Sequence, residues 1–375
     1  LGGQDIRYIT KSGLPALETV TASAALLAEH ASLPSQGKAL WLGCGHGAAA
    51  AALARRFPTA HLTMLDDNYI AIRMAMRTLV ANGVENACVL EQVSALPQAQ
   101  AAFDVVIIDL PKGRRMAQRW LAEAWHALRP GGQLFLAGAN DLGIQSLVKD
   151  ASQLFGVGGV LDYRKGNRVV KWIKGQALAC QWIHAPGVAP GTWHRLEVET
   201  PAGSLALLSL PGVFSYNKLD EGTALLLDSI QFTPGERLLD LGCGCGIIGV
   251  SAARMGAAHV DLVDSSLLAV ACAQANLASH HLAQARALAS DGLSAVQDQR
   301  YDRILSNPPF HAGKGVDYQM AQAFIQQSWQ ALEPGGTLAL VANRFIRYEN
   351  ILEKFFSHIS VLAETGKFKV LAGRK

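Results

Sequence analysis

The tetrapeptide Asn307-Pro308-Pro309-Phe310 combines groups that suit the binding of a planar amino group. It follows the apolar run 301–306, which predicts a position just past the C-terminal end of a buried strand. The prolines lack backbone donors, which leaves carbonyl oxygens free to accept hydrogen bonds. The Asn307 side chain adds another carbonyl oxygen, and Phe310 adds a flat apolar face. The pattern indicates chemistry at an exocyclic or amide nitrogen, although an Asn-Pro-Pro turn also ends strands for structural reasons alone.

A glycine-rich loop lies upstream, between a predicted strand at 237–241 and a predicted helix at 247–255. Glycine permits backbone angles and a close ligand approach that side chains would block. The Gly-x-Gly-x-x-Gly spacing over 244–249 also satisfies the dinucleotide fingerprint, which leaves NAD as an alternative ligand. Asp240 stands before these glycines, where a carboxylate attracts a cationic sulfonium and an amine but opposes a pyrophosphate. The loop therefore favours S-adenosylmethionine.

Two further acids continue the pattern of a doubly wound sheet. Asp264 ends a predicted strand at 260–264, where an acid commonly accepts hydrogen bonds from ribose hydroxyls. Asp291 follows a predicted third strand, in a position to bond the amino group of adenine. Nothing downstream resembles hydride-transfer chemistry, which counts against NAD. The order of acid, glycine loop, acid, acid and Asn-Pro-Pro-Phe therefore predicts a sulfonium cofactor beside an amine.

On these residues, the segment 205–375 resembles the class I S-adenosylmethionine-dependent methyltransferases, in the branch that methylates amino groups. The runs 210–215 and 219–227 and the extension 311–313 make it similar to the bacterial ribosomal RNA guanine-N2 methyltransferases, the RsmC and RlmG type. That resemblance implies 16S or 23S rRNA as substrate, with 16S favoured. It also implies that the segment 220–222 lies against the methionine part of the cofactor.

The candidate site residues form three groups. The catalytic candidates are Asn307, Pro308, Pro309 and Phe310. The cofactor-binding candidates are Asp220, Gly222, Asp240, Gly242, Cys243, Gly244, Gly246, Asp264, Asp291 and Asn307. The candidates for contact with RNA phosphates, each equally explained as a solvated surface residue, are Lys112, Arg114, Arg115, Arg119, His311, Lys314 and Arg344. No metal site is predicted, because Cys243 and Cys245 have no second Cys/His pair at ligand spacing.

The resemblance implies a mechanism in which guanine N2 is the nucleophile. The Asn307 side-chain oxygen and the Pro308 carbonyl would accept the two N2 hydrogens, which aims the nitrogen lone pair at the sulfonium methyl group. Phe310 would stack on a base that has left its helix. Methylation itself acidifies the nitrogen, so no strong general base is expected, and positioning of the two reactants supplies most of the acceleration.

The chain also contains an internal duplication. The segments 40–47, 65–66, 103–111 and 128–132 echo 239–246, 263–264, 301–309 and 332–336. Trp41 replaces Asp240, and Asp109-Leu110-Pro111-Lys112 replaces the Asn-Pro-Pro-Phe motif. We therefore expect an α/β protein of two tandem Rossmann-like class I methyltransferase domains: a degenerate copy at 1–185, structural or RNA-binding, and a catalytic copy at 186–375. The retained glycines and Asp66 leave open whether the first copy keeps a cofactor cleft.

Composition limits the class of protein. With 375 residues, half of them hydrophobic, the chain can fill two cores. No apolar run approaches the length of about 18 residues that a membrane span needs, and no secretory leader is evident, so we expect a cytoplasmic protein. The six cysteines are expected to be free thiols. A net charge of +3 is too small for a protein that binds nucleic acids without regard to sequence along their length.

The expected partner is ribosomal RNA or a ribosomal subunit, bound by a monomer with two pseudo-repeated domains. Three alternatives remain on sequence alone. The chain could methylate 23S rRNA, because the motifs do not separate the two subunits. It could methylate another amine, such as the N5 of a protein glutamine, since the same tetrapeptide serves that chemistry. It could also be a non-catalytic RNA-binding assembly factor, which the intact acids and glycines of the second copy disfavour.

Overall fold

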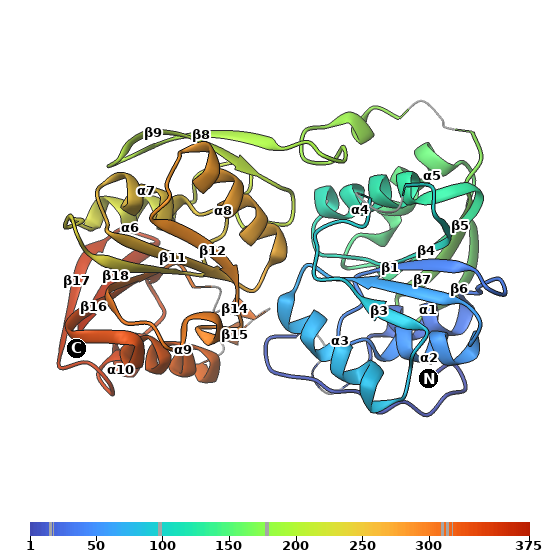
Figure 1. The fold of residues 1–375 in the computed structure, drawn as a ribbon, viewed down its shortest axis with the longest axis horizontal. Coiled ribbons are helices and arrows are strands. Elements are labelled where there is room, and N and C mark those ends of the chain that lie inside the picture. Colours follow the sequence, from blue (N-terminus) through green and yellow to red (C-terminus); the bar gives the residue numbers. More distant parts are fainter. Residues whose placement is uncertain are drawn as a thin grey trace. The chain divides into compact units, whose positions relative to one another are not determined.

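A computed structural model shows two compact units, Leu1–Trp193 and His194–Lys375 (Figure 1). The predicted boundary after residue 185 falls slightly earlier, within the segment that precedes the second unit. The structure describes residues 1–14, 17, 19–96, 100–176, 180–308, 311–312, 315–316 and 318–375, with backbone alone at 311–312, 315–316 and 318. Pro309, Phe310 and Lys314 lie outside the described residues.

The first unit is built around a seven-stranded sheet of order β3-β2-β1-β4-β5-β7-β6 (Figure 1). The pairings among β1 to β5 are parallel, and β7 is antiparallel to both of its neighbours. The elements are α1 (Ala22–His30), β1 (Lys38–Leu42), α2 (Ala48–Arg56), β2 (His61–Leu65), α3 (Tyr69–Ala81), β3 (Ala87–Val89), β4 (Phe103–Asp109), α4 (Arg114–Ala127), β5 (Leu128–Ala139), α5 (Ile144–Phe155), β6 (Gly159–Arg164), β7 (Asn167–Ile173) and η1 (Trp182–His184).

The second unit repeats this sheet in the order β12-β11-β10-β13-β16-β18-β17 and adds two small hairpins. The elements are β8 (His194–Thr200), β9 (Gly203–Ser209), α6 (Glu221–Ser229), β10 (Arg237–Leu241), α7 (Ile247–Arg254), β11 (His259–Asp264), α8 (Leu267–Ser279), β12 (Ala285–Ala289), η2 (Ser294–Val296), β13 (Tyr301–Ser306), β14 (His311–Ala312), β15 (Gly315–Val316), α9 (Tyr318–Ala331), β16 (Leu332–Asn343), α10 (Glu349–Leu352), β17 (His358–Glu364) and β18 (Phe368–Arg374). The identical strand order confirms the predicted α/β class and the internal duplication.

Each sheet reverses its winding direction at one central strand, and this position determines where a ligand can bind. In the second unit β10 pairs in parallel with β11 on one side and with β13 on the other. In the first unit β1 pairs in the same way with β2 and β4. Open α/β sheets bind ligands outside the carboxyl ends of the strands at such a switch point. The loops that follow β10, β11 and β13 are therefore expected to form the ligand-binding site.

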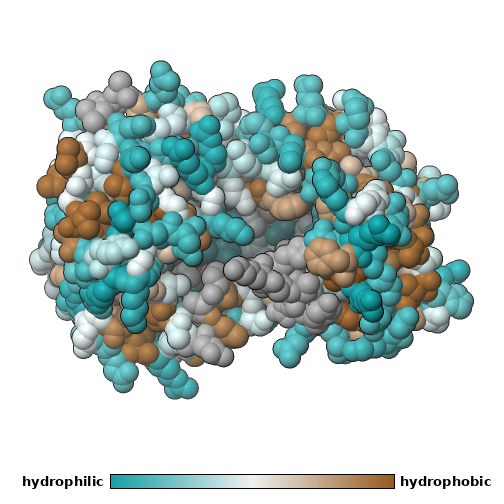
Figure 2. All heavy atoms as spheres, turned by 180° about the vertical axis from the view of Figure 1, so that it is seen from behind, coloured by the Kyte–Doolittle hydropathy of each residue, from teal (hydrophilic) through white to brown (hydrophobic). Residues whose placement is uncertain are grey.

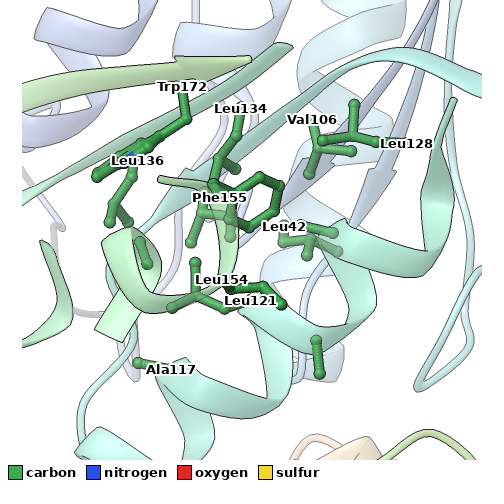
Figure 3. Packing of buried hydrophobic residues seen from close by; sticks show 14 of the residues in the cluster. Leu42, Val106, Ala117, Leu121, Leu128, Leu134, Leu136, Leu154, Phe155 and Trp172 are labelled. Carbon is green, nitrogen blue, oxygen red and sulfur yellow. The ribbon is translucent and has the colours of Figure 1, made fainter. Parts of the chain in front are cut away.

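Helices pack on both faces of each sheet, which explains why the central strands read as nearly continuous apolar runs. In the first unit, α4 and α5 cover one face through Leu121, Leu154 and Phe155 (Figure 3). Trp172 of β7 is 1% exposed there, and its indole Nε1 donates to the Gly156 carbonyl at 3.1 Å. The dense core fixes the sheet and so fixes the loops at its strand ends.

A substitution of Gly249 in α7 tests how closely that helix packs on the sheet of the second unit. A Cβ atom at this position would lie 2.5 Å from Leu262 Cγ of β11, in a fully buried place. We expect Gly249→Ala to lower the free energy of unfolding, because overpacking costs about 1–3 kcal/mol and exceeds the helix-propensity gain of about 1 kcal/mol. Gly366→Ala, at an exposed position with open space around the new methyl group, is the matched control. Equal urea midpoints for the two variants would contradict this packing.

The surface carries hydrophobic residues in separate groups among hydrophilic ones on the face that Figure 2 shows. Exposed large apolar side chains include Val160 and Leu161 on the edge strand β6, and Val361 and Leu362 on the edge strand β17. All six cysteines are free thiols, as expected. Within the described residues, none of the helices combines the length and the apolar character that crossing a membrane requires.

Candidate cofactor and amine-binding site

The glycine loop joins the carboxyl end of β10 to the start of α7. Gly242, Gly244 and Gly246 have φ angles of 78°, 55° and 87°, a left-handed backbone that L side chains rarely adopt. The Gly242 and Cys243 backbone N–H groups both donate to the Val263 carbonyl at the end of β11. The loop therefore has a fixed shape, and it lies at the switch point of the sheet.

Asp264 ends β11, and its side chain binds the backbone of this loop at the second glycine, Gly244. Its Oδ2 accepts a hydrogen bond from the Gly244 N–H at 2.9 Å, and its Oδ1 accepts one from the Ser266 N–H at 2.8 Å. The side chain is half-buried. Asp264 therefore lies at the predicted strand end, where its carboxylate shapes the glycine loop.

Asp240 lies beneath the loop and is fully buried. Its Oδ2 accepts from the Gly249 N–H at 2.9 Å, which satisfies one of the free donors in the first turn of α7. Burial, together with the charge of Asp264, raises its pKa to about 7 against the lowering effect of that hydrogen bond. Its Oδ1 is a buried acceptor with no hydrogen-bond partner among the described residues. Since buried acceptors are normally satisfied, a water or a ligand donor would complete this position.

Asn307 follows β13, which is the neighbour of β10 in the sheet, and the glycine loop follows β10. Its Nδ2 donates to Asp220 Oδ2 at 3.0 Å and to Thr223 Oγ1 at 2.8 Å. Asp220 is the N-cap of α6, and the same Oδ2 accepts from the Thr223 N–H at 3.0 Å. An ionised carboxylate only accepts, so the NH₂ end of the amide must face it. The amide oxygen is therefore directed away from Asp220 and Thr223.

The remaining cofactor candidates lie on neighbouring loops. Asp291 follows β12 and is half-buried, with its N–H donating to Ser294 Oγ. Gly222 lies in α6, where an added Cβ would approach Asp220 Oδ2 to 3.1 Å and the Phe368 ring to 3.4 Å. Val213, from the run 210–215, comes within 3.9 Å of a Cβ built on Gly244. Segments far apart in the chain are thus brought to one edge of the sheet.

Thr223 is a site residue that was absent from the sequence-based set. It is buried, and both its backbone and its hydroxyl take part in the contacts around Asn307. The available signal was its place three residues after Asp220 at the start of an apolar helix, since an N-cap side chain bonds the backbone at that spacing. Nothing in the sequence indicated its contact with Asn307.

The cationic candidates are partly engaged within their own units. Arg114 Nε and Nη2 donate to the nearly fully buried Asp150 at 2.8 and 2.7 Å, which clamps α4 to α5. Arg344 pairs with Glu364 at 2.5 Å, and Arg115 donates to Gln118. Lys112 is exposed and Arg119 is half-buried, while His311 is described by its backbone alone. The two ion pairs favour structural roles for Arg114 and Arg344.

The first unit keeps a carboxylate that binds the backbone of its glycine loop, but a tryptophan ring packs against that loop. Asp66 accepts from the Gly45 and Asn68 N–H groups, each at 2.9 Å, as Asp264 does in the second unit. A Cβ at Gly43 would meet the Trp120 ring at 2.8 Å, whereas one at Gly242 meets no described atom within 4 Å. Trp120 therefore occupies, in the first copy, a position that the described part of the second copy leaves open.

Comparisons with known proteins agree with this duplicated architecture. The family described as methyltransferase small domain matches residues 5–170 and again residues 204–372. A Shewanella loihica protein described as ribosomal RNA small subunit methyltransferase C is 36% identical over 282 residues, which cover 75% of this chain and 79% of that protein. The protein of the same description from Pseudomonas entomophila is 36% identical over 279 residues, covering 72% of this chain and 79% of its own.

Among solved structures, the T. thermophilus 16S rRNA N2 G1207 methyltransferase (RsmC), in complex with AdoMet and guanosine, is similar over both units. The alignment has a TM-score of 0.83 at 31% identity and covers 98% of this chain and 95% of that chain. The matched length and the identity exceed what a shared fold alone would give. The chain therefore belongs to the methyltransferase small domain family, within its ribosomal RNA small subunit methyltransferase C group.

Proposed function

We propose that this protein transfers a methyl group from S-adenosylmethionine to the exocyclic N2 of a guanine in 16S rRNA. The single observation that carries the proposal is the Asn307 amide, held by Asp220 and Thr223 with its oxygen turned away from them, opposite the glycine loop. The likeness over nearly the whole chain to a 16S rRNA guanine-N2 methyltransferase supports the same substrate. A cytoplasmic location follows from a ribosomal RNA substrate in bacterial relatives.

The cofactor fits the residues at the ends of β10, β11 and β12. Gly242, Gly244 and Gly246 allow close backbone approach, with Cys243 contributing a small buried side chain. The half-buried carboxylate of Asp264 suits ribose hydroxyls, and Asp291 suits the adenine amino group. The orphaned Oδ1 of Asp240 suits an N–H donor of the ligand or a bound water. The bound cofactor supplies an electrophilic methyl group on a positively charged sulfur.

The reaction itself needs positioning more than proton transfer. The Asn307 Oδ1 and the Pro308 carbonyl would accept the two N2 hydrogens of guanine, and Phe310 would stack on the base. These bonds favour a pyramidal nitrogen, whose lone pair then points at the methyl group. As the new N–C bond forms and the S–C bond breaks, the nitrogen becomes acidic and its extra proton leaves to solvent. Alignment of two bound reactants supplies most of the acceleration.

The first unit has a different task in this proposal, because its loop is occupied by Trp120 and its strand-end acid replaces the amide. We assign it a structural and RNA-contacting role, in which the exposed Lys112 and the neighbouring Arg115 and Arg119 contact phosphates. His311, Lys314 and Arg344 are the corresponding candidates near the catalytic loop. Arg114 would contribute only if it left Asp150.

The raised pKa of Asp240 gives a pH test of cofactor binding. Burial raises that pKa to about 7, so the free protein is protonated there below pH 7. A cationic ligand favours the ionised carboxylate and lowers the pKa, so binding releases a proton and affinity rises as the pH increases toward about 7. Calorimetry in buffers of different ionisation enthalpy measures the release. Asp240→Asn should abolish the dependence, and S-adenosylhomocysteine, which lacks the sulfonium charge, should show less of it.

Mass spectrometry of rRNA tests the substrate in the cell. Ribosomal RNA from a strain lacking this gene should lose one N2-methylguanine from 16S rRNA, and the wild-type gene should restore it. The Asn307→Ala gene should fail to restore it. Loss of the modified guanine from 23S rRNA instead, with 16S rRNA unchanged, would contradict the proposed substrate.

A further inference from the structure

Resting on the proposed function, we infer that Asp220 and Thr223 are positioning residues that lock the Asn307 amide in the one orientation able to accept the substrate amine. Asp220 also caps α6, and Thr223 lies in the first turn of that helix. Their contacts reach across 87 and 84 residues of sequence to the end of β13, so they link α6 to the catalytic loop. These two contacts, which we call the lock, therefore contribute to kcat together with the Asn307 amide itself.

The hydrogen-bond pattern leaves the amide no equivalent alternative. Asp220 Oδ2 accepts from Asn307 Nδ2 at 3.0 Å, from the Thr223 N–H at 3.0 Å and from Thr223 Oγ1 at 3.4 Å. The Thr223 hydroxyl is thereby a donor to Asp220 and an acceptor from Asn307. A rotated amide would set its oxygen against the carboxylate, and two acceptors at that distance repel each other. With Thr223 buried, water has little access to relieve the mismatch.

The first unit supplies an internal comparison, because it holds the same two positions with donor and acceptor exchanged. Thr21 is the N-cap of α1, as Asp220 is of α6, and Asp109 ends β4 at the position corresponding to Asn307. There the helix cap donates, since Thr21 Oγ1 lies 3.4 Å from Asp109 Oδ2. Changing only the strand-end member, with Asp220 kept, would place two carboxylates, both acceptors, side by side. Both positions differ together, as expected if the two side chains work as a pair.

A double-mutant cycle tests the pair by the same exchange. We expect Asp220→Asn to lower kcat about tenfold, because a neutral amide oxygen is a weaker acceptor than a carboxylate and the new NH₂ group can turn toward the Asn307 amide. Asparagine still caps α6, so the fold and the dissociation constant for S-adenosylmethionine should change little. Asn307→Asp alone should lower kcat similarly near pH 8. The double variant, with the amide now on α6 and the carboxylate on the loop, should recover about tenfold over either single variant.

The pH profile separates positioning from a merely structural contact. The Asn307→Asp variant places two carboxylates together, and they can hydrogen-bond only by sharing one proton. Its kcat should therefore be highest at low pH and fall as that proton leaves, whereas the double variant should show no such fall. The charged groups of the neighbouring elements are the same in every variant; they are Lys218, Glu221, Asp240, Asp264, Lys367 and Lys369.

Thr223→Val isolates the hydroxyl, and Thr21→Val in the first unit is its matched control. The first change removes one acceptor of the Asn307 amide and should lower kcat about tenfold. The second removes the hydroxyl that donates to Asp109 at the strand end of the first unit and should leave kcat unchanged, although it removes a helix cap and lowers the thermal midpoint. Melting curves for both variants check that the proteins are folded at the assay temperature.

The outcomes distinguish the inference from the function on which it rests. If the wild-type protein transfers no methyl group to guanine N2, the proposed function fails. If it does, but Asp220→Asn keeps its kcat while its affinity for S-adenosylmethionine falls, Asp220 is a cofactor contact and the lock is wrong. A double variant no more active than Asp220→Asn, with a pH profile like that of Asn307→Asp, would overturn the lock as well.

Discussion

Replacing Asn307 by alanine is expected to lower kcat for methyl transfer at least about a hundredfold, the cost seen when a polarising hydrogen-bond partner is removed from an active site. In the proposed mechanism, the amide oxygen accepts a hydrogen bond from the guanine amine and turns it toward the methyl group. The dissociation constant for S-adenosylmethionine should stay within about threefold of the wild type, because the described cofactor candidates on β10 and β11 do not contact this side chain. The two effects should therefore separate.

Single-turnover kinetics with saturating cofactor, alongside calorimetry, measures that separation. Asp109→Ala is the matched control, since it removes the side chain at the same position of the first unit. The Asp109 carboxyl accepts a hydrogen bond from Thr21 within the first unit, and burial raises its pKa to about 7. We expect the control to keep its kcat. If Asn307→Ala turned over within a few-fold of wild type, the assigned role of the amide would be wrong.

Replacing Asp264 by alanine is expected to weaken the binding of S-adenosylmethionine about a hundredfold, or by about 2–3 kcal/mol, the usual value of hydrogen bonds to a charged group. The carboxylate holds the Gly244 and Ser266 N–H groups, so the change also loosens the loop that must approach the ligand. Both losses act on cofactor binding before any chemistry occurs.

Asp66→Ala repeats the same change in the first unit, where the carboxylate holds Gly45 and Asn68 in the same way. We expect cofactor affinity to be unchanged, because Trp120 lies over the glycine loop of that copy. Calorimetric titration of both variants, with thermal melting to confirm folding, makes the comparison. Equal weakening by the two changes would mean that both copies bind the cofactor and that Trp120 does not close the first site.

Sequence periodicity was sufficient for the elements that carry the site. The predicted strands at 237–241, 260–264 and 301–306 are present as β10, β11 and β13. Parallel strands buried on both faces leave long apolar runs, and glycines mark the turns between them, so these signals are local. The corresponding runs in the first half made the duplication visible in the same way.

Contacts between distant residues were beyond the reach of sequence reasoning. The place of Asp240 before the glycines is visible in the sequence, whereas its full burial and its hydrogen bond from the Gly249 N–H are not. Arg114, a candidate for RNA contact, also forms an ion pair with Asp150 on the next helix, which no local pattern indicates. Local patterns do not encode such pairings, because they depend on how helices pack across the sheet.

Three differences between the two copies lie at positions that the proposed reaction uses in the second unit. Trp41 cannot accept a hydrogen bond, so it cannot replace Asp240 at the start of the following helix. Trp120 adds bulk above Gly43, and Asp109 reverses the polarity of the strand-end position. Each change removes a different requirement of methyl transfer while the sheet order stays intact.

Transfer of a radiolabelled methyl group from S-adenosylmethionine to ribosomal substrates tests the central assignment most directly. The purified protein should label 16S rRNA, free or within the small subunit, and digestion to nucleosides should place all the label in N2-methylguanosine. The Asn307→Ala protein should give little label under the same conditions. Label in adenine, in 23S rRNA or in a protein glutamine, or none with any of these substrates, would contradict the account.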